Sequence, residues 1–198
     1  MEWTTVGDFA GTTRNQWNYQ TTRPRGVACV GDDVFVVGSV DGSWVVRKSS
    51  DGGATWPVVD NFRLSSGDDC HAYGIAADSL GNVIVVGTGK QTVTIGKGRN
   101  STTETKTYWV VREGTGGGTS WTTVDQYQYP VAGGTGVAYA VTVAPDNGVH
   151  VTGSGASAST SERWVTRHRS AATGLWFRPP PCGRWSSRTR RTGRRCGR

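Results

Sequence analysis

The sequence lacks the long hydrophobic runs that membrane helices need. No stretch of about 18 apolar residues occurs in the 198-residue chain, so no membrane partner is expected. Leucine occurs only three times and methionine once, whereas glycine occurs 29 times. This composition favours short strands and many turns over helices. An N-terminal targeting signal is also missing, and the compartment stays open on these grounds.

Acidic residues are missing from residues 178–198, which contain eight arginines. Subtracting those eight charges from the formal net charge of +7 leaves −1 on residues 1–177. The basic pI therefore belongs to the tail, and nucleic acid is not an expected partner of the folded part. Two interpretations of the tail stay open. One is a disordered basic segment, and the other is a GC-rich gene read out of frame.

Metal-ligand spacing is missing among the four cysteines, which are Cys29, Cys70, Cys182 and Cys196. No metal site and no cofactor are therefore expected. A Cys29–Cys70 disulfide would require an oxidising compartment, and two unpaired thiols are the favoured interpretation.

Tryptophan is abundant, and its positions reveal an internal repeat. The pattern Trp-Val-Val/Thr-Arg begins at Trp44, Trp109 and Trp164, and a second tryptophan follows each 12 positions later. Two copies continue into a Val-Asp-x-aromatic step, at 59–62 and 124–127. The N-terminal stretch 3–9 resembles 121–127, so seven of the nine tryptophans occupy repeat positions. Self-similarity at a period of roughly 50 to 65 residues predicts a repeat architecture.

Each unit is expected to contain four short antiparallel strands, lettered a to d. Runs of valine and isoleucine within them indicate sheets covered on both faces. The units span 26–62, 74–127 and 138–177, with one leading strand over 3–9. The predicted strands are 26–30, 34–38, 44–48 and 55–62 in the first unit, 75–77, 83–87, 109–113 and 119–127 in the second, and 141–143, 149–153 and 164–168 in the third.

The turn between the third and fourth strands of the first unit carries the pattern S-x-D-x-G-x-T-W. Ser49, Asp51, Gly53, Thr55 and Trp56 fill it. This pattern resembles the Asp-box of sialidase-like (BNR-repeat) β-propellers. The second copy is degenerate, and the third keeps little beyond its tryptophan. The resemblance implies an all-β fold, a partial β-propeller of about three four-stranded antiparallel blades plus the leading strand. It also slightly favours a secreted or cell-surface location.

Three blades do not close a propeller, which usually has four to eight. The chain is therefore expected to be a fragment that is completed by missing blades, or to close with further copies of itself, and the fragment is favoured. Edges and faces of an open arc would otherwise stay exposed.

Function is expected at the end of the sheets that carries the b–c loops (88–108 and 154–163) and the d–a loops (63–72 and 128–137). Long loops on a rigid scaffold are where binding residues gather. Two interpretations stay open for the polar cluster from Asp68 to His71: contact with a ligand or cation, or a solvated loop. The candidate ligand-binding residues there are Asp68, Asp69 and His71, beside Cys70, together with Glu104 and Tyr108.

Other side chains that suggest catalysis have structural interpretations. Asp51 is expected to close its turn rather than act as an acid. Arg47, Arg112 and Arg167 could form the carboxylate-binding arginine cluster of sialidases, but all three occupy one repeat position, which favours packing or stacking on an aromatic ring. Tyr73 and Tyr139 are equivalent positions too. No catalytic residues are predicted.

Three hypotheses about function follow. The leading one is a non-catalytic propeller that binds a glycan or protein ligand through its b–c and d–a loops. The second is a fragment of a sialidase-type glycoside hydrolase. The third is a truncated or frameshifted product without activity.

Overall fold

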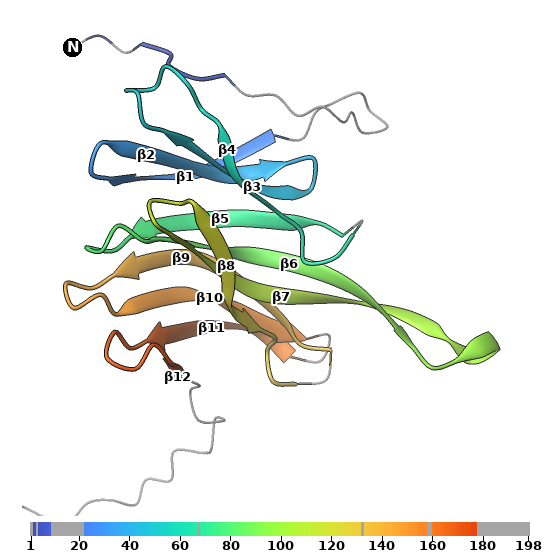
Figure 1. The fold of residues 1–198 in the computed structure, drawn as a ribbon. Helices are drawn as coiled ribbons and strands as arrows, with labels where there is room; N and C mark the ends of the chain where they lie inside the picture. Colours follow the sequence, from blue (N-terminus) through green and yellow to red (C-terminus); the bar gives the residue numbers. More distant parts are fainter. Residues whose placement is uncertain are drawn as a thin grey trace, which may run out of the picture.

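The chain folds into three antiparallel β-sheets, and the part of it that the structure describes contains no α-helix (Figure 1). The structure is a computed structural model that describes residues 2, 4–8, 22–66, 68–131, 133–157 and 160–177. A single 3₁₀ turn, η1 (Gly98–Asn100), is the only helical element in those ranges. The expected all-β class is confirmed. The expected tail, 178–198, lies outside the described residues.

Each sheet is a meander in which consecutive strands pair side by side. The last strand of the third sheet has only two residues. The first sheet contains β1 (Thr22–Val30), β2 (Asp33–Val40), β3 (Ser43–Ser49) and β4 (Val58–Phe62). The second contains β5 (Cys70–Ala77), β6 (Val83–Ile95), β7 (Thr102–Thr115) and β8 (Ser120–Tyr127). The third contains β9 (Thr135–Val143), β10 (Val149–Ser157), β11 (Thr160–Arg169) and β12 (Trp176–Phe177).

The three sheets stack face to face in chain order, as Figure 1 shows. The first strands of successive sheets touch: β5 packs against β1 on one side and against β9 on the other. These first strands each form one edge of their sheet. They together make up what is called here the inner edge of the stack.

Two hydrophobic layers lie between the sheets. The first joins the first and second sheets around Phe35, Trp44 and Val85, and the second joins the second and third around Trp109 and Val151. All of these side chains are essentially inaccessible to solvent. Valines on both faces of β6 and β7 enter the two layers, so the unbroken apolar runs reflect a central sheet that is covered on both sides.

A charged pair also crosses each layer at the same repeat position. Arg112 on β7 makes two 2.8 Å bonds to the Asp60 carboxylate on β4, and its guanidinium lies 4.2 Å from the Phe62 ring centre. Arg167 on β11 repeats both contacts with Asp125 at 2.8 Å and with Tyr127 at 4.3 Å. The arginine of one sheet therefore pairs with the aspartate and stacks on the aromatic ring of the Val-Asp-x-aromatic step in the sheet before it. This contact explains why the Trp-Val-Val/Thr-Arg motif and the Val-Asp-x-aromatic step recur together.

Two expectations about the chain path are wrong. The b–c segment 88–108 is not a loop, because β6 and β7 continue through it in register from Lys90–Thr107 to Ile95–Thr102 and form the long hairpin that projects from the stack in Figure 1. Alternating threonines supply the β-branched side chains that favour this extension. The segment 154–163 is likewise mostly strand, in β10 and β11.

The leading strand expected over 3–9 does not form in its described part. Residues 4–8 carry no strand. A strand needs a ladder partner, and this segment instead accepts a side-chain bond, from the Trp56 indole N–H to the Val6 carbonyl at 2.9 Å.

Candidate functional site

The turn from Ser49 to Trp56 is closed by its own side chains. The Ser49 hydroxyl donates to the Asp51 carboxylate at 2.8 Å and accepts the Gly53 N–H at 2.8 Å. The same carboxylate accepts the Thr55 N–H at 2.9 Å and its hydroxyl at 2.5 Å. These bonds, the Thr55 hydroxyl foremost, lower the pKa of Asp51 to about 2. Three of the roughly four acceptor sites of the Asp51 carboxylate are thus already used by the turn.

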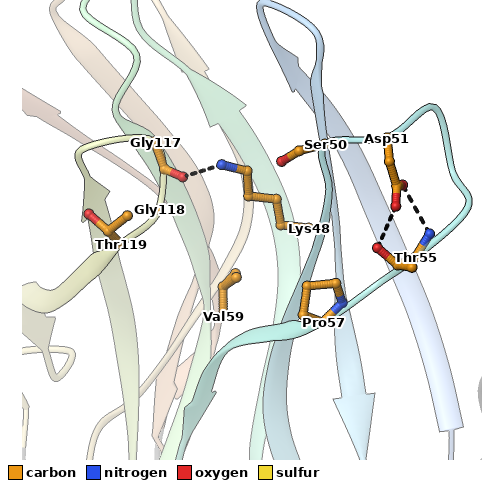
Figure 2. Close-up of a pocket in the computed structure, with 9 residues that line it drawn as sticks. All are labelled: Lys48, Ser50, Asp51, Thr55, Pro57, Val59, Gly117, Gly118 and Thr119. Atoms are coloured by element: carbon orange, nitrogen blue, oxygen red, sulfur yellow. Dashed lines mark hydrogen bonds between the residues drawn. The ribbon is translucent and has the colours of Figure 1, made fainter.

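Beside this turn lies a shallow hollow of about 440 Å³, shown in Figure 2. It separates the first-sheet turn from the Gly117–Thr119 segment of the second sheet. The Lys48 ammonium crosses the gap, donating to the Gly117 carbonyl at 3.0 Å while pairing with Asp33 at 2.7 Å. The two charged groups of the hollow, Lys48 and Asp51, are both engaged within the scaffold. The hollow therefore lies along the boundary between two sheets, and both of its charged side chains are bound to neighbouring groups of the protein.

The structure assigns Asp68 of the predicted loop cluster to a structural contact. Its carboxylate accepts the backbone N–H of Thr92 at 2.7 Å, the Thr92 hydroxyl at 2.8 Å and the Ser65 hydroxyl at 2.5 Å. The Ser65 bond is the main cause of a lowered pKa for Asp68. Asp68 therefore fastens the loop after β4 to the base of the β6–β7 hairpin.

Its neighbours Asp69 and Cys70 have separate environments. Asp69 is exposed and pairs with Lys90 at 3.8 Å. Cys70 is fully buried, its sulfur accepts the Leu64 N–H at 3.1 Å, and burial raises the pKa of its thiol. Cys70 and the exposed Cys29 are both free, as expected. Among the described residues no group of three or more His, Cys, Asp or Glu side chains is placed to hold a metal ion.

Glu104 and Tyr108 lie on β7 and do not join the loop residues in one site. Tyr108 stands opposite Gly89 and packs against the first hydrophobic layer. Glu104 stands opposite Val93, farther along the projecting hairpin. The sequence analysis placed them in a b–c loop at the same end of the sheets as the loop with the aspartates, whereas the segment is a continuous pair of strands.

A different group gathers on the inner edge. Arg25, Tyr73 and Tyr139 are each the extra residue where the pairing of β1, β5 or β9 shifts register. The Arg25 guanidinium lies 5.3 Å from the Tyr73 ring centre, and the Tyr73 and Tyr139 rings are 5.6 Å apart. Because a β-bulge re-aims its residue, the same irregularity in three stacked sheets aligns three side chains in one row.

Two further residues complete what is called here the inner-edge cluster: Arg23, Arg25, His71, Tyr73 and Tyr139. The His71 ring lies 6.3 Å from that of Tyr73, and its Nδ1 is 2.9 Å from the Ser39 hydroxyl on β2. Both arginines are exposed, and about half of Tyr139 is accessible to solvent. His71 is the one predicted site residue that the structure brings to this group.

Burial sets the protonation of the cluster. It lowers the pKa of His71 below its ordinary value, and the positive charges of Lys90, Arg23 and Arg25 act in the same direction against the opposing effect of Asp69. Burial also raises the pKa of Tyr73, partly offset by Arg25. At neutral pH the cluster therefore presents two guanidinium groups, a neutral His71 imidazole and the protonated phenol of Tyr73. Such a surface can bind an anion and stack a flat or apolar ligand face.

Sequence reasoning missed the two arginines. The available signal was two cations flanking Pro24, just before the strand predicted over 26–30. Tyr73 and Tyr139 were recognised as equivalent repeat positions, and in the structure their rings are neighbours across two stacked sheets.

Comparison with known proteins adds no relative: no family model matches the chain, and no curated protein matches it. The described residues contain no helix with the length and apolar character needed to cross a membrane.

Proposed function

We propose that the chain is a partial β-propeller whose inner-edge cluster binds an anionic ligand of the acidic-glycan class, without chemistry on it. The observation that carries this proposal is the row of bulge residues Arg25, Tyr73 and Tyr139 at spacings of 5.3 and 5.6 Å. An arginine next to aromatic rings pairs with a carboxylate while the rings pack against the C–H face of a sugar.

The propeller part of the proposal is supported by the repeated interface. Successive four-stranded meanders meet through the same Arg–Asp pair and with their first strands in contact. In a propeller the first strands of the blades surround the central axis, and the row of bulge residues would then face that axis. The turn geometry around Asp51 agrees with the Asp-box resemblance as far as one copy goes.

The binding part is supported by what the charged groups already do. Arg112 and Arg167 are buried in pairs with Asp60 and Asp125 and cannot also hold a substrate carboxylate. Tyr73 has a raised pKa, and a tyrosine nucleophile would need the opposite shift to ionise near neutral pH. Arg23 and Arg25 remain as exposed cations beside two tyrosines. Binding of an anion needs only the two charged arginines and the neighbouring tyrosine rings, with no change in their protonation.

The test is calorimetric titration with sialyllactose, which carries a carboxylate, and with lactose, which does not. The proposal expects binding of the acidic sugar only, and an affinity loss of about tenfold for Arg25→Gln, the effect of one charged hydrogen bond. Tyr139→Ala should weaken binding while Tyr139→Phe, which keeps the ring, should not. Arg99→Gln removes another exposed charge, at the tip of the hairpin, and is the matched control.

Equal binding of both sugars, or equal losses for Arg25→Gln and Arg99→Gln, would contradict the proposal. Binding of an acidic protein surface in place of both sugars, with the same dependence on Arg25, would move the ligand to the protein class and reject the glycan.

A glycoside hydrolase of sialidase type is the second candidate, on one observation. Tyr139 and Glu162 line the same hollow of about 380 Å³ on the third sheet, and a tyrosine with a neighbouring glutamate is the pair that such a reaction requires. Release of fluorophore from a sialoside, abolished by Tyr139→Phe, would establish this activity. The first candidate expects no release of fluorophore from the wild-type chain, so this assay separates the two candidates.

A further inference from the structure

The three repeat tryptophans have very different exposures. Trp44 and Trp109 are completely buried, whereas 85% of Trp164 is exposed. All three begin the same Trp-Val-Val/Thr-Arg motif on the third strand of their sheet. Trp44 enters the layer shared with the second sheet and Trp109 the layer shared with the third. Trp164 lies on the corresponding face of the third sheet, which no described residue covers.

A glycine in the neighbouring sheet makes room for the buried ring. A Cβ built on Gly153 of β10 would stand 2.9 Å from Cζ3 of Trp109, closer than any real contact. Gly136 of β9 is placed similarly, 3.2 Å from the Trp109 Cβ. The indole of one sheet therefore lies against backbone of the next, in a space that only glycine leaves open.

The first sheet has this same space, and no described residue of another sheet places an indole in it; the tryptophan that lines it is Trp56, from the turn before β4. Gly38 of β2 corresponds to Gly153: a Cβ there would stand 2.3 Å from the Arg23 carbonyl, as one on Gly153 would stand 1.9 Å from that of Val137. Gly38 lines a groove of about 510 Å³ together with Val36, Val45 and Arg47. Residues 5–8 form its other wall.

This groove faces away from the rest of the stack. Phe35, Val37, Trp44 and Val46 point into the layer with the second sheet. Side chains alternate along a strand, so Val36, Val45 and Arg47 occupy the opposite face. The two ends of the stack thus differ. One end exposes Trp164, and the other exposes a groove over Gly38, which resembles the space over Gly153 where Trp109 packs inside the molecule.

We propose that a second copy of this chain docks head to tail, with Trp164 of one copy in the groove over Gly38 of the other. The interface continues the one between the second and third sheets, in which Trp109 lies over Gly153. It is heterologous, because two different patches meet, and it closes into a ring if the second junction also forms. By the same equivalence the junction places Arg25 of the second copy beside Tyr139, so the inner-edge row continues across it.

Sedimentation of the full chain over a range of concentrations tests the proposal. The wild-type chain is expected to self-associate, and Trp164→Gln to weaken association by about 30-fold, as loss of a central aromatic anchor does. Leu80→Gln removes an apolar side chain that is 75% exposed elsewhere, on the β5–β6 turn, and should leave association unchanged. Val36→Lys places a charge in the groove and should act like Trp164→Gln.

Mixing the two defective variants separates head-to-tail docking from any symmetric contact. Trp164→Gln keeps an intact groove and Val36→Lys keeps an intact tryptophan, so an equimolar mixture can form one good junction. Each variant alone should sediment as a monomer, and the mixture should show a dimer. A monomeric wild-type chain at all concentrations, equal effects of Trp164→Gln and Leu80→Gln, or a mixture that stays monomeric would each overturn the proposal. Circular dichroism of each variant shows that any loss of association is not loss of fold.

Discussion

The pair between Arg112 and Asp60 offers the sharpest test of how the sheets hold together. Both side chains are nearly inaccessible, with 9% and 8% of their surface exposed, and two bonds of 2.8 Å join them. Asp60→Asn keeps the shape and one acceptor but leaves the guanidinium without a counter-charge. Arg112→Met keeps much of the side-chain length and leaves the carboxylate alone in the layer.

The expected magnitude follows from burial. Removing one partner of a buried pair costs about 3 to 5 kcal/mol, because the remaining charge stays desolvated. The contact of Arg112 with the Phe62 ring at 4.2 Å adds to the loss for Arg112→Met. In the double variant no unpaired charge remains, so its loss should be smaller than the sum of the single losses by about 2 kcal/mol or more.

Urea unfolding, with linear extrapolation to water, gives the free energies of unfolding for this cycle. The exposed pair Lys90–Asp69, at 3.8 Å, is the internal control, and its disruption should cost no more than about 1 kcal/mol. Similar small losses at both pairs, or additive losses for Asp60→Asn and Arg112→Met, would refute the claim that the repeated arginine fastens one sheet to the next.

Three other predictions follow from protonation and burial. Asp51 has a lowered pKa of about 2, so its contribution to stability is complete above the ordinary value of 3.8 and is lost as the pH falls toward 2; Asp51→Asn should flatten acid unfolding in that window, measured by fluorescence. The pKa of His71 is lowered by burial, so affinity for an anionic ligand should rise as the pH falls below 6.5 and the ring gains its proton, and titrations of His71→Asn should lose this rise. With the cysteines beyond residue 177 replaced by serine, maleimide should label the exposed Cys29 quickly and the buried Cys70 only on unfolding, as mass spectrometry would show.

The sequence made the sheets predictable because the residues that join them are the residues that repeat. Trp109 packs into a layer, and Arg112 pairs across one, at positions fixed by their own sheet. The Val-Asp-x-aromatic step supplies the partner in the sheet before. A periodic pattern is visible in one sequence whenever the same contact is made more than once.

The site was harder to read, because it depends on adjacency between strands that are distant in the chain. Arg25 and Tyr73 are 48 positions apart and meet only because β1 and β5 stack with bulges in matching places. The hairpin was misjudged for a local reason: glycine and lysine near 96–98 indicate a turn, but the threonines on either side continue the strands. The exposure of Trp164 has one small signal in the sequence: Thr166 stands where the two buried copies have the buried valines Val46 and Val111.

At the inner edge, three separate sheets must place their first strands side by side. Tyr73→Cys and Tyr139→Cys, in a chain whose own cysteines are replaced by serine, put one thiol on β5 and one on β9, at residues whose rings lie 5.6 Å apart. A short dithiol cross-linker should join them within a single chain at high yield, while Tyr73→Cys combined with Thr103→Cys, on the projecting hairpin, should not be joined. Efficient cross-linking of the second pair, or none of the first in the folded chain, would contradict the stacked arrangement.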